Sequence, residues 1–310
     1  MAFPGELEEA RAAMSQATAS EMNSSRMTHR SSDFAAGDGL RLHLQSWTPP
    51  GEPAAVLAVV HGYGEHGGRY QYLAEAMTAR GLGVSAYDLR GHGQSAGARG
   101  HISRFADYLG DTRAFLEEVA RRQPGAPVYL LGHSLGGLIA TAYAEAGAEG
   151  LEGLILSTPL LRLGTPVPAL KVQAARLLSR LAPGRDIGNP LLAEDLSHEP
   201  HVVAAYVTDP LNHHVATARW AAEVLAAQRA ALSVAHRLTL PLLLLYAGAD
   251  TVTDPKASRE LFAAAASADK VEHGYEGYYH ELFNETGREA VFADLAAWLD
   301  SRLPGARRPG

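Results

Sequence analysis

Residues 128–137 of the chain read VYLLGHSLGG. This stretch joins a short apolar run to the pattern G-x-S-x-G, which presents a nucleophilic serine on a sharp turn between a strand and a helix. The chain contains the pattern a second time, as GQSAG at residues 93–97. Because the pattern alone is not specific, the surrounding sequence has to show which serine is a nucleophile.

The sequence around Ser134 meets each requirement of such a turn. A buried strand must run directly into it, a helix must begin at once, and small neighbours must let the backbone come close. VYLLG precedes Ser134, two glycines follow closely, and LIATAYAEA continues as a helix. Ser95 lacks this context, because the nearest apolar run ends at Asp88 and the glycine-rich GARGHIS follows. We therefore interpret Ser134 as the nucleophile and Ser95 as a polar loop residue.

Apolar runs alternate with amphipathic segments along most of the chain, which predicts an α/β fold with a mainly parallel sheet and helices on both faces. A hairpin is expected at 33–49. Further strands are predicted at 54–60, 84–88, 128–132, 151–157, 241–248 and 270–275, and helices at 70–80, 101–122, 135–146, 255–268 and 288–302. Residues 158–238 break the alternation. They are mostly helical in pattern, and we expect them to form a cap on one end of the sheet.

The two ends of the chain differ from this regular part. Residues 1–30 are rich in Ala, Ser, Glu and Met without sustained apolar periodicity, so we expect a loose or partly helical extension. They lack the apolar segment of a secretory signal, and Met27 is an alternative start of translation. One domain is therefore expected at 31–302, with its cap insertion at 158–238 and a frayed tail at 303–310.

The composition argues against several classes of function. A formal net charge of −7 argues against binding to nucleic acid. The absence of cysteine excludes disulfides, thiolate metal sites and a cysteine nucleophile, and it is compatible with a reducing cytoplasm. No apolar run reaches the roughly 18 residues of a membrane-spanning helix. The insertion contains His198, His201, His213 and His214 without carboxylates at ligand spacing, so we interpret them as surface residues and expect no metal.

A serine hydroxyl needs a base to take its proton and a carboxylate to orient that base. In a sheet with this turn, the acid and then the histidine follow the serine along the chain. Asp250 comes directly after the strand at 241–248 and is favoured as the acid, whereas Asp254 precedes a proline and is typical of a helix N-cap. His280 lies in the last loop and is favoured as the base over His273, which falls inside a predicted strand.

Two backbone N–H groups are needed to stabilise the oxyanion that forms during attack. One is expected from Leu135, directly after the nucleophile. The other is expected from Tyr63 in the loop HGYG at 61–64, where glycines on both sides allow close approach to a substrate oxygen.

Six blocks of sequence together resemble the monoacylglycerol lipase and lysophospholipase group of the α/β-hydrolases. They are HGYGEHGGRY (61–70), YDLRGHGQSAG (87–97), GHSLGG (132–137), DPL (209–211), AGADTVTD (247–254) and YEGYYHE (275–281). The resemblance runs from about residue 31 to 302. It implies an α/β-hydrolase fold and cofactor-free ester hydrolysis through a triad of Ser134, Asp250 and His280, and it implies that Ser95 belongs to a structural loop.

The resemblance also implies that Glu65, Arg69 and Tyr206 lie near a glycerol head group. Mammalian monoacylglycerol lipases have a histidine three residues after the catalytic one, where this chain has Phe283. The expected substrate is monoacylglycerol. A lysophospholipid or another carboxylic ester is the alternative, and a catalytically idle fold member is a third reading. We expect a cytoplasmic protein with a small lipid ester as its partner. Transient contact of the cap with a lipid surface is a further hypothesis, and the oligomeric state is left open.

Overall fold

The computed structural model describes residues 27–189 and 191–303, and within them the chain forms an eight-stranded sheet of order β1-β2-β4-β3-β5-β6-β7-β8. The strands are β1 (Thr28–Ala35), β2 (Arg41–Thr48), β3 (Val56–Val60), β4 (Gly83–Tyr87), β5 (Val128–His133), β6 (Gly153–Ser157), β7 (Leu242–Ala247) and β8 (Lys270–Tyr275). β2 pairs antiparallel with β1 and β4, whereas β4, β3, β5, β6, β7 and β8 run parallel. The predicted α/β architecture is confirmed.

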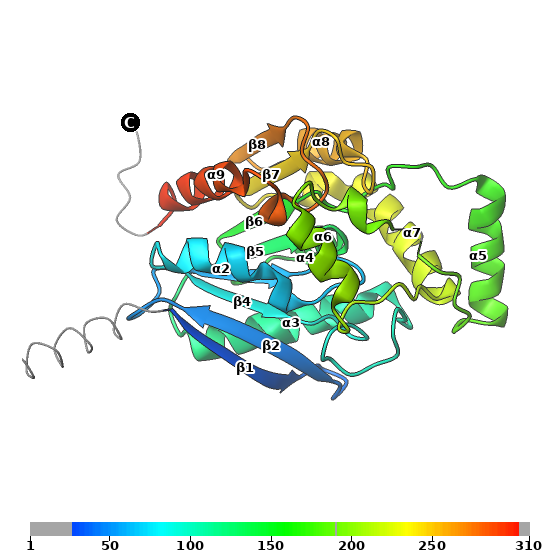
Figure 1. Ribbon diagram of the computed structural model, residues 1–310, viewed down its shortest axis with the longest axis horizontal. Helices are drawn as coiled ribbons and strands as arrows, with labels where there is room; N and C mark the ends of the chain where they lie inside the picture. Colours follow the sequence, from blue (N-terminus) through cyan, green and yellow to red (C-terminus); the bar gives the residue numbers. More distant parts are fainter. Residues whose placement is uncertain (1–26, 190, 304–310) are drawn as a thin grey trace, which may run out of the picture.

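Helices cover both faces of this sheet (Figure 1). They are α2 (Gln71–Thr78), α3 (Phe105–Arg122), α4 (Leu135–Ala146), α5 (Ala169–Leu181), α6 (Pro200–Thr208), α7 (Ala218–Val234), α8 (Pro255–Ala264) and α9 (Arg288–Asp300). One core joins the sheet to α3, α4, α7 and α8, and a second core joins it to α2 and α9. Along β5, Leu130 enters the first core and Leu131 the second, so burial on both faces explains the continuous apolar runs of the sequence.

The segment 158–238 contains α5, α6 and α7 and lies over one end of the sheet (Figure 1). α7 packs against α3 and α4, and α5 packs against α7, so α5 is the outermost helix of this cap. The mostly helical pattern predicted for 158–238 is confirmed by these three helices. Within the described residues, no helix is long and apolar enough to span a membrane.

Several predicted boundaries were wrong, and α8 ends at Ala264 rather than at 268. β1 already begins at Thr28, because Thr28–Ala35 pairs along its whole length with β2, so the extension cannot reach residue 30. The other residues predicted to form the extension and the tail, 1–26 and 304–310, lie outside the described residues. α3 begins at Phe105 rather than at 101, because the Asp107 carboxylate accepts the Arg104 N–H at 3.0 Å and ends the preceding loop there.

The turn between β5 and α4 depends on glycines because backbone atoms meet there. A Cβ atom on Gly136 would lie 1.9 Å from the Val60 carbonyl oxygen, and one on Gly132 would lie 2.3 Å from the Gly136 carbonyl oxygen. Neither contact can be relieved by rotating a side chain. These distances confirm the sequence interpretation that small residues allow the turn to close.

We expect Gly136→Ala to lower the free energy of unfolding by about 3 kcal/mol or more, because the added methyl group overlaps the end of β3. Gly110→Ala is the matched control. Gly110 is exposed inside α3 with no atom within 4 Å of an added Cβ, so alanine should raise stability by roughly 0.5–1 kcal/mol. Chemical denaturation of both variants measures the difference, and a Gly136→Ala protein as stable as the unaltered chain would contradict this account of the turn.

Candidate active site

Ser134 sits at the apex of the turn with φ 52° and ψ −116°, a region that side-chain-bearing residues rarely occupy. Three backbone hydrogen bonds fix its position. Its N–H donates to the Ser157 carbonyl (3.0 Å), and its own carbonyl accepts from Leu138 (3.1 Å) and Leu160 (2.8 Å). Its hydroxyl has no hydrogen-bond partner among the described residues, and Ser134 lines a pocket that His280 also lines. The strained backbone therefore presents a free hydroxyl at the carboxyl end of β5.

His280 and Asp250 form a buried pair at the same edge of the sheet. His280 Nδ1 lies 2.8 Å from Asp250 Oδ2, with 4% and 1% of the two side chains exposed. Asp250 directly follows β7, and its carboxylate also accepts the N–H groups of Val252 (2.8 Å) and Thr253 (2.9 Å) and the Thr253 hydroxyl (2.7 Å). Burial alone would raise the pKa of Asp250, but His280 and these donors outweigh it and hold that pKa below its usual value.

The electrostatics make His280 a stronger base than its neighbour His133. Burial tends to lower the pKa of His280, yet the charge and hydrogen bond of Asp250 raise it above its ordinary value. Burial, together with His280, lowers the pKa of His133 to about 3, so His133 stays neutral. The two rings lie 4.8 Å apart. Ser134 and His280 line the same pocket, and no hydrogen bond joins them among the described residues.

The alternative acid and base lie elsewhere. The Asp254 side chain caps α8 by accepting the Lys256 N–H (2.9 Å) and pairs with Arg162 (3.0 Å). His273 lies on β8 beside Asp294, with 36% of its side chain exposed. Neither residue lines the pocket.

Ser95 has a structural role in the loop after β4. Its hydroxyl donates to the Asp88 carbonyl (2.5 Å) and accepts the His43 N–H (2.8 Å), so it joins this loop to β2. Ser95 does not line the pocket with Ser134.

The two expected oxyanion donors, Tyr63 and Leu135, both have backbone N–H groups without a hydrogen-bond acceptor in the part of the chain that is described. Tyr63 lines the pocket, and Leu135 directly follows Ser134 without being one of the lining residues. The N–H of Gly62 is occupied, since it donates to Glu65 Oε1 at 2.5 Å. The Tyr63 side chain turns toward the cap, where its hydroxyl contacts the Val215 carbonyl and its ring packs against Trp220.

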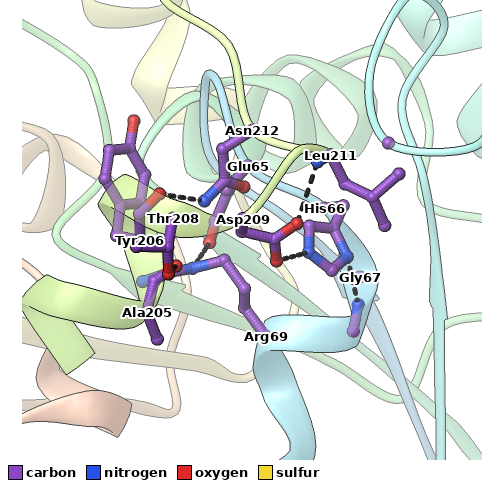
Figure 2. A network of polar contacts seen from close by, with 12 residues as sticks. Glu65, His66, Gly67, Arg69, Ala205, Tyr206, Thr208, Asp209, Leu211 and Asn212 are labelled. Carbon is purple, nitrogen blue, oxygen red and sulfur yellow. Dashed lines mark hydrogen bonds and ion pairs between the residues drawn. The ribbon is translucent and has the colours of Figure 1, made fainter. Parts of the chain in front are cut away.

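The three residues assigned to a head group form a buried network with further residues of the cap (Figure 2). Arg69 Nε lies 3.1 Å from Glu65 Oε2, and the Arg69 guanidinium lies 4.8 Å from the centre of the Tyr206 ring. Glu65 and Tyr206 line the pocket, whereas Arg69 is not one of the lining residues. The Tyr206 hydroxyl is buried without a partner among the described residues.

Sequence reasoning missed Glu281. This residue follows His280, is 4% exposed and lines the pocket, and its carboxylate lies 2.5 Å from Arg69 Nη2. The signal was present in the block YEGYYHE, where an acidic residue directly follows the histidine. Phe283 is not part of this site. It is buried in the core beneath α9, where its ring lies 6.3 Å from that of Phe292.

The interpretation of all four insertion histidines as surface residues was wrong for His213. Its side chain is buried between the rings of Tyr63 (5.5 Å) and His92 (4.5 Å), because this stretch of the cap packs on the loop that follows β3. The described residues contain no group of three or more His, Cys, Asp or Glu side chains that could hold a metal ion.

A strained serine at a strand-to-helix turn, with a buried acid–histidine pair after later strands of a parallel sheet, defines an α/β-hydrolase. The chain belongs to the hydrolase family described as serine aminopeptidase S33, whose model matches residues 51–287. It is 36% identical over 288 residues to a monoacylglycerol lipase of Mycolicibacterium smegmatis, covering 91% of this chain and 100% of that protein. It is also 36% identical over 274 residues to human monoglyceride lipase, covering 87% of this chain and 90% of the human protein.

The solved structures agree with these relatives. The crystal structure of Paleococcus ferrophilus monoacylglycerol lipase matches with a TM-score of 0.74 and 33% identity, covering 88% of this chain and 98% of that one. The chain is thus a monoacylglycerol lipase-like α/β-hydrolase.

We expect Asp250→Asn to lower kcat by a factor on the order of 10⁴, because an amide cannot hold His280 in the tautomer that accepts a proton from serine. Asp254→Asn is the matched control and should keep both activity and most of the stability, because Asn caps a helix about as well as Asp. Steady-state kinetics with thermal unfolding measure both effects. If a folded Asp254→Asn protein lost its turnover, the roles of the two aspartates would have to be exchanged.

Proposed function

We propose that the chain is a carboxylic ester hydrolase that cleaves esters with a single acyl chain, with monoacylglycerol as its substrate, by a serine mechanism. The observation that carries the proposal is the pocket shared by the free hydroxyl of Ser134 and the Asp250-bound His280. The relatives named as monoacylglycerol lipases support the substrate class.

In the proposed first step, His280 Nε2 takes the proton of Ser134 Oγ while the oxygen attacks the ester carbonyl carbon. The carbonyl oxygen becomes an oxyanion that accepts the N–H groups of Tyr63 and Leu135. When the intermediate collapses, the bond to the glycerol oxygen breaks and His280 returns the proton to that oxygen. Glycerol leaves, and the acyl group stays on Ser134.

In the second step, water attacks the acyl-enzyme and His280 accepts one of the water protons. The bond between the acyl carbon and Ser134 Oγ then breaks, the proton passes to Oγ, and a fatty acid is released. His280 must be neutral at the start of each step. Because Asp250 raises the pKa of His280, activity should fall as the pH drops through that raised value.

The charge of the pocket favours a neutral head group over a phosphate. Two carboxylates, Glu65 and Glu281, share the single guanidinium of Arg69, which leaves this end of the pocket with an excess of negative charge. An anionic phosphate would be repelled here, whereas glycerol hydroxyls can donate to carboxylate oxygens or bond to the free Tyr206 hydroxyl. This observation favours a monoacylglycerol over a lysophospholipid.

The cap offers apolar surface both inside and outside. Its pocket-facing side contributes to an apolar lining made of Leu160, Leu163, Leu191, Leu196, Trp220 and Val252, which suits one acyl chain.

On the outer helix α5, Leu170, Leu177 and Leu181 are 79%, 59% and 76% exposed, and the same helix carries Lys171, Arg176 and Arg180 without an acidic residue. A basic amphipathic helix of this kind favours peripheral contact with an anionic lipid surface.

We expect Ser134→Ala to abolish both ester hydrolysis and covalent labelling by a fluorophosphonate, because the attacking oxygen is removed. Ser95→Ala should lose buried hydrogen bonds worth about 1–3 kcal/mol of stability and keep both activities. Mass spectrometry of the labelled proteins, with kinetics of each variant, gives the result. Labelling that persisted in Ser134→Ala would place the nucleophile elsewhere.

We expect kcat/KM for monoacyl esters to rise about fourfold per methylene until the apolar lining is filled, because each buried methylene is worth about 0.8 kcal/mol. A triacylglycerol, with two further chains, should be a poor substrate. The measurement is a chain-length series on soluble and vesicle-borne monoesters. Triacylglycerol turnover equal to that of the matched monoester would refute the single-chain site.

Leu177→Glu on α5 should slow hydrolysis in anionic vesicles and leave the hydrolysis of a soluble ester unaffected.

A further inference from the structure

Arg69 lies between two buried carboxylates that come from opposite ends of the chain. Its Nε contacts Glu65 Oε2 at 3.1 Å, and its Nη2 contacts Glu281 Oε2 at 2.5 Å. The exposed fraction is 9% for the Arg69 side chain and 5% for each glutamate side chain. At this degree of burial, solvent screens the ion pairs weakly, and removing one partner leaves a buried charge unpaired.

Glu65, the first of the two carboxylates, also binds the loop that carries the Tyr63 N–H. Glu65 Oε1 accepts the Gly62 N–H at 2.5 Å and the Tyr70 hydroxyl at 2.9 Å. Gly62 precedes Tyr63, so its hydrogen bond fixes the peptide next to the proposed oxyanion donor. A Cβ atom on Gly62 would lie 2.9 Å from Glu65 Oε1, which shows how closely the carboxylate follows the loop.

Glu281, the second carboxylate, belongs to the loop that carries the proposed base, His280. Glu281 directly follows His280, and its N–H donates to the Leu196 carbonyl at 2.8 Å. Its Oε2 also accepts the Asn284 side-chain amide at 2.9 Å. The backbone and the carboxylate of Glu281 are therefore both held by hydrogen bonds or ion pairs, one residue from His280.

We propose that Arg69 and Glu281 are positioning residues, and that the bridge Glu65–Arg69–Glu281 holds the oxyanion loop and the histidine loop at a fixed separation. This inference rests on the proposed serine mechanism. Catalysis requires the oxyanion donors and the base to act on the same carbonyl group, and a misplacement of about 1 Å can cost a factor of 10² in rate. Two hydrogen-bonding edges of Arg69 are already used by carboxylates, and Arg69 does not line the pocket, so its main partners are protein groups.

Positioning and head-group binding make different predictions for two substrates. A bridge that places catalytic groups acts on every ester, whereas a ligand for glycerol acts on glycerol esters alone. We therefore compare a monoacylglycerol with p-nitrophenyl butyrate, which has no glycerol. Because Arg69→Met leaves two buried carboxylates without their cation and destabilises the fold, Glu281→Gln is the principal variant. Glutamine keeps the volume and an acceptor oxygen and removes the charge.

Glu281→Gln should lower kcat about tenfold or more on both esters, with KM for p-nitrophenyl butyrate unchanged, and any larger loss on the monoacylglycerol measures the contact of Glu281 with glycerol. In combination with Arg69→Met, the losses should be less than multiplicative, since either change breaks the same bridge. Arg69→Lys keeps the charge but cannot hold two carboxylates in one planar fork, so it should recover part of the rate. Rates are normalised to the fraction of protein that a fluorophosphonate labels at completion.

The pH dependence of kcat/KM gives a second test, because a residue with only a structural role would not shift it. Asp250 is the largest source of the raised pKa of His280, and Glu281 and Glu65 contribute in the same direction. Removing the charge of Glu281 makes the imidazolium less stable, so the acid limb of kcat/KM should shift to lower pH. Arg90→Met is the matched control, because Arg90 also joins two carboxylates, Asp111 (2.6 Å) and Asp38 (3.1 Å), outside the pocket. It should lower stability and leave kcat and the acid limb in place.

A loss confined to the monoacylglycerol would overturn the proposal and make the bridge a head-group ligand. Fully multiplicative losses in the double variant, or a folded Glu281→Gln protein with unchanged kcat on both esters, would also overturn it. The unaltered chain is measured in the same assay. Its inactivity on both esters would contradict the proposed function itself, whereas failure of the bridge shows in variants of an active chain.

Discussion

The active-site geometry depends on the backbone conformation of Ser134. A residue with a side chain can hold φ 52° because the surroundings leave it no alternative: its N–H and carbonyl are bound to Ser157, Leu138 and Leu160, and Gly136 presses against the end of β3. The stability of the packed sheet thus offsets a local cost of about 1–3 kcal/mol. The backbone groups of Ser134 are thus hydrogen-bonded, while its hydroxyl is left without a partner among the described residues at the pocket.

The same edge of the sheet gathers the remaining groups. β3, β5, β7 and β8 are parallel, so the segments after their carboxyl ends lie side by side, although Tyr63 and His280 are far apart in sequence. Thr158, which follows β6, links two of these segments, since its hydroxyl lies 3.1 Å from His133 Nδ1 and 3.0 Å from the His280 carbonyl oxygen. The site is therefore a set of loops cross-connected by buried polar contacts, with the sheet as its rigid base.

The cap is joined to this edge by polar contacts as well as by packing. His66 Nε2 lies 2.8 Å from Asp209 Oδ2 at the end of α6, the His213 N–H donates to the Gly64 carbonyl (3.0 Å), and the Tyr63 hydroxyl contacts Val215 (Figure 2 shows the first of these). These contacts fall on the loop that carries the proposed oxyanion donor. Cap and donor loop are consequently joined into one unit.

The sequence was enough to predict a mainly parallel sheet with helices on both faces and to favour a nucleophile, an acid and a base. These inferences follow from short-range patterns, such as the apolar run before Ser134, the proline after Asp254 that indicates a helix cap, and the position of Asp250 directly after a strand. It did not determine that Glu281 closes a bridge through Arg69 to Glu65, that His213 is buried, or that Phe283 belongs to the core. These features become visible in the folded chain, because each depends on which side chains face one another across loops separated by many residues, and local periodicity carries no information about such contacts.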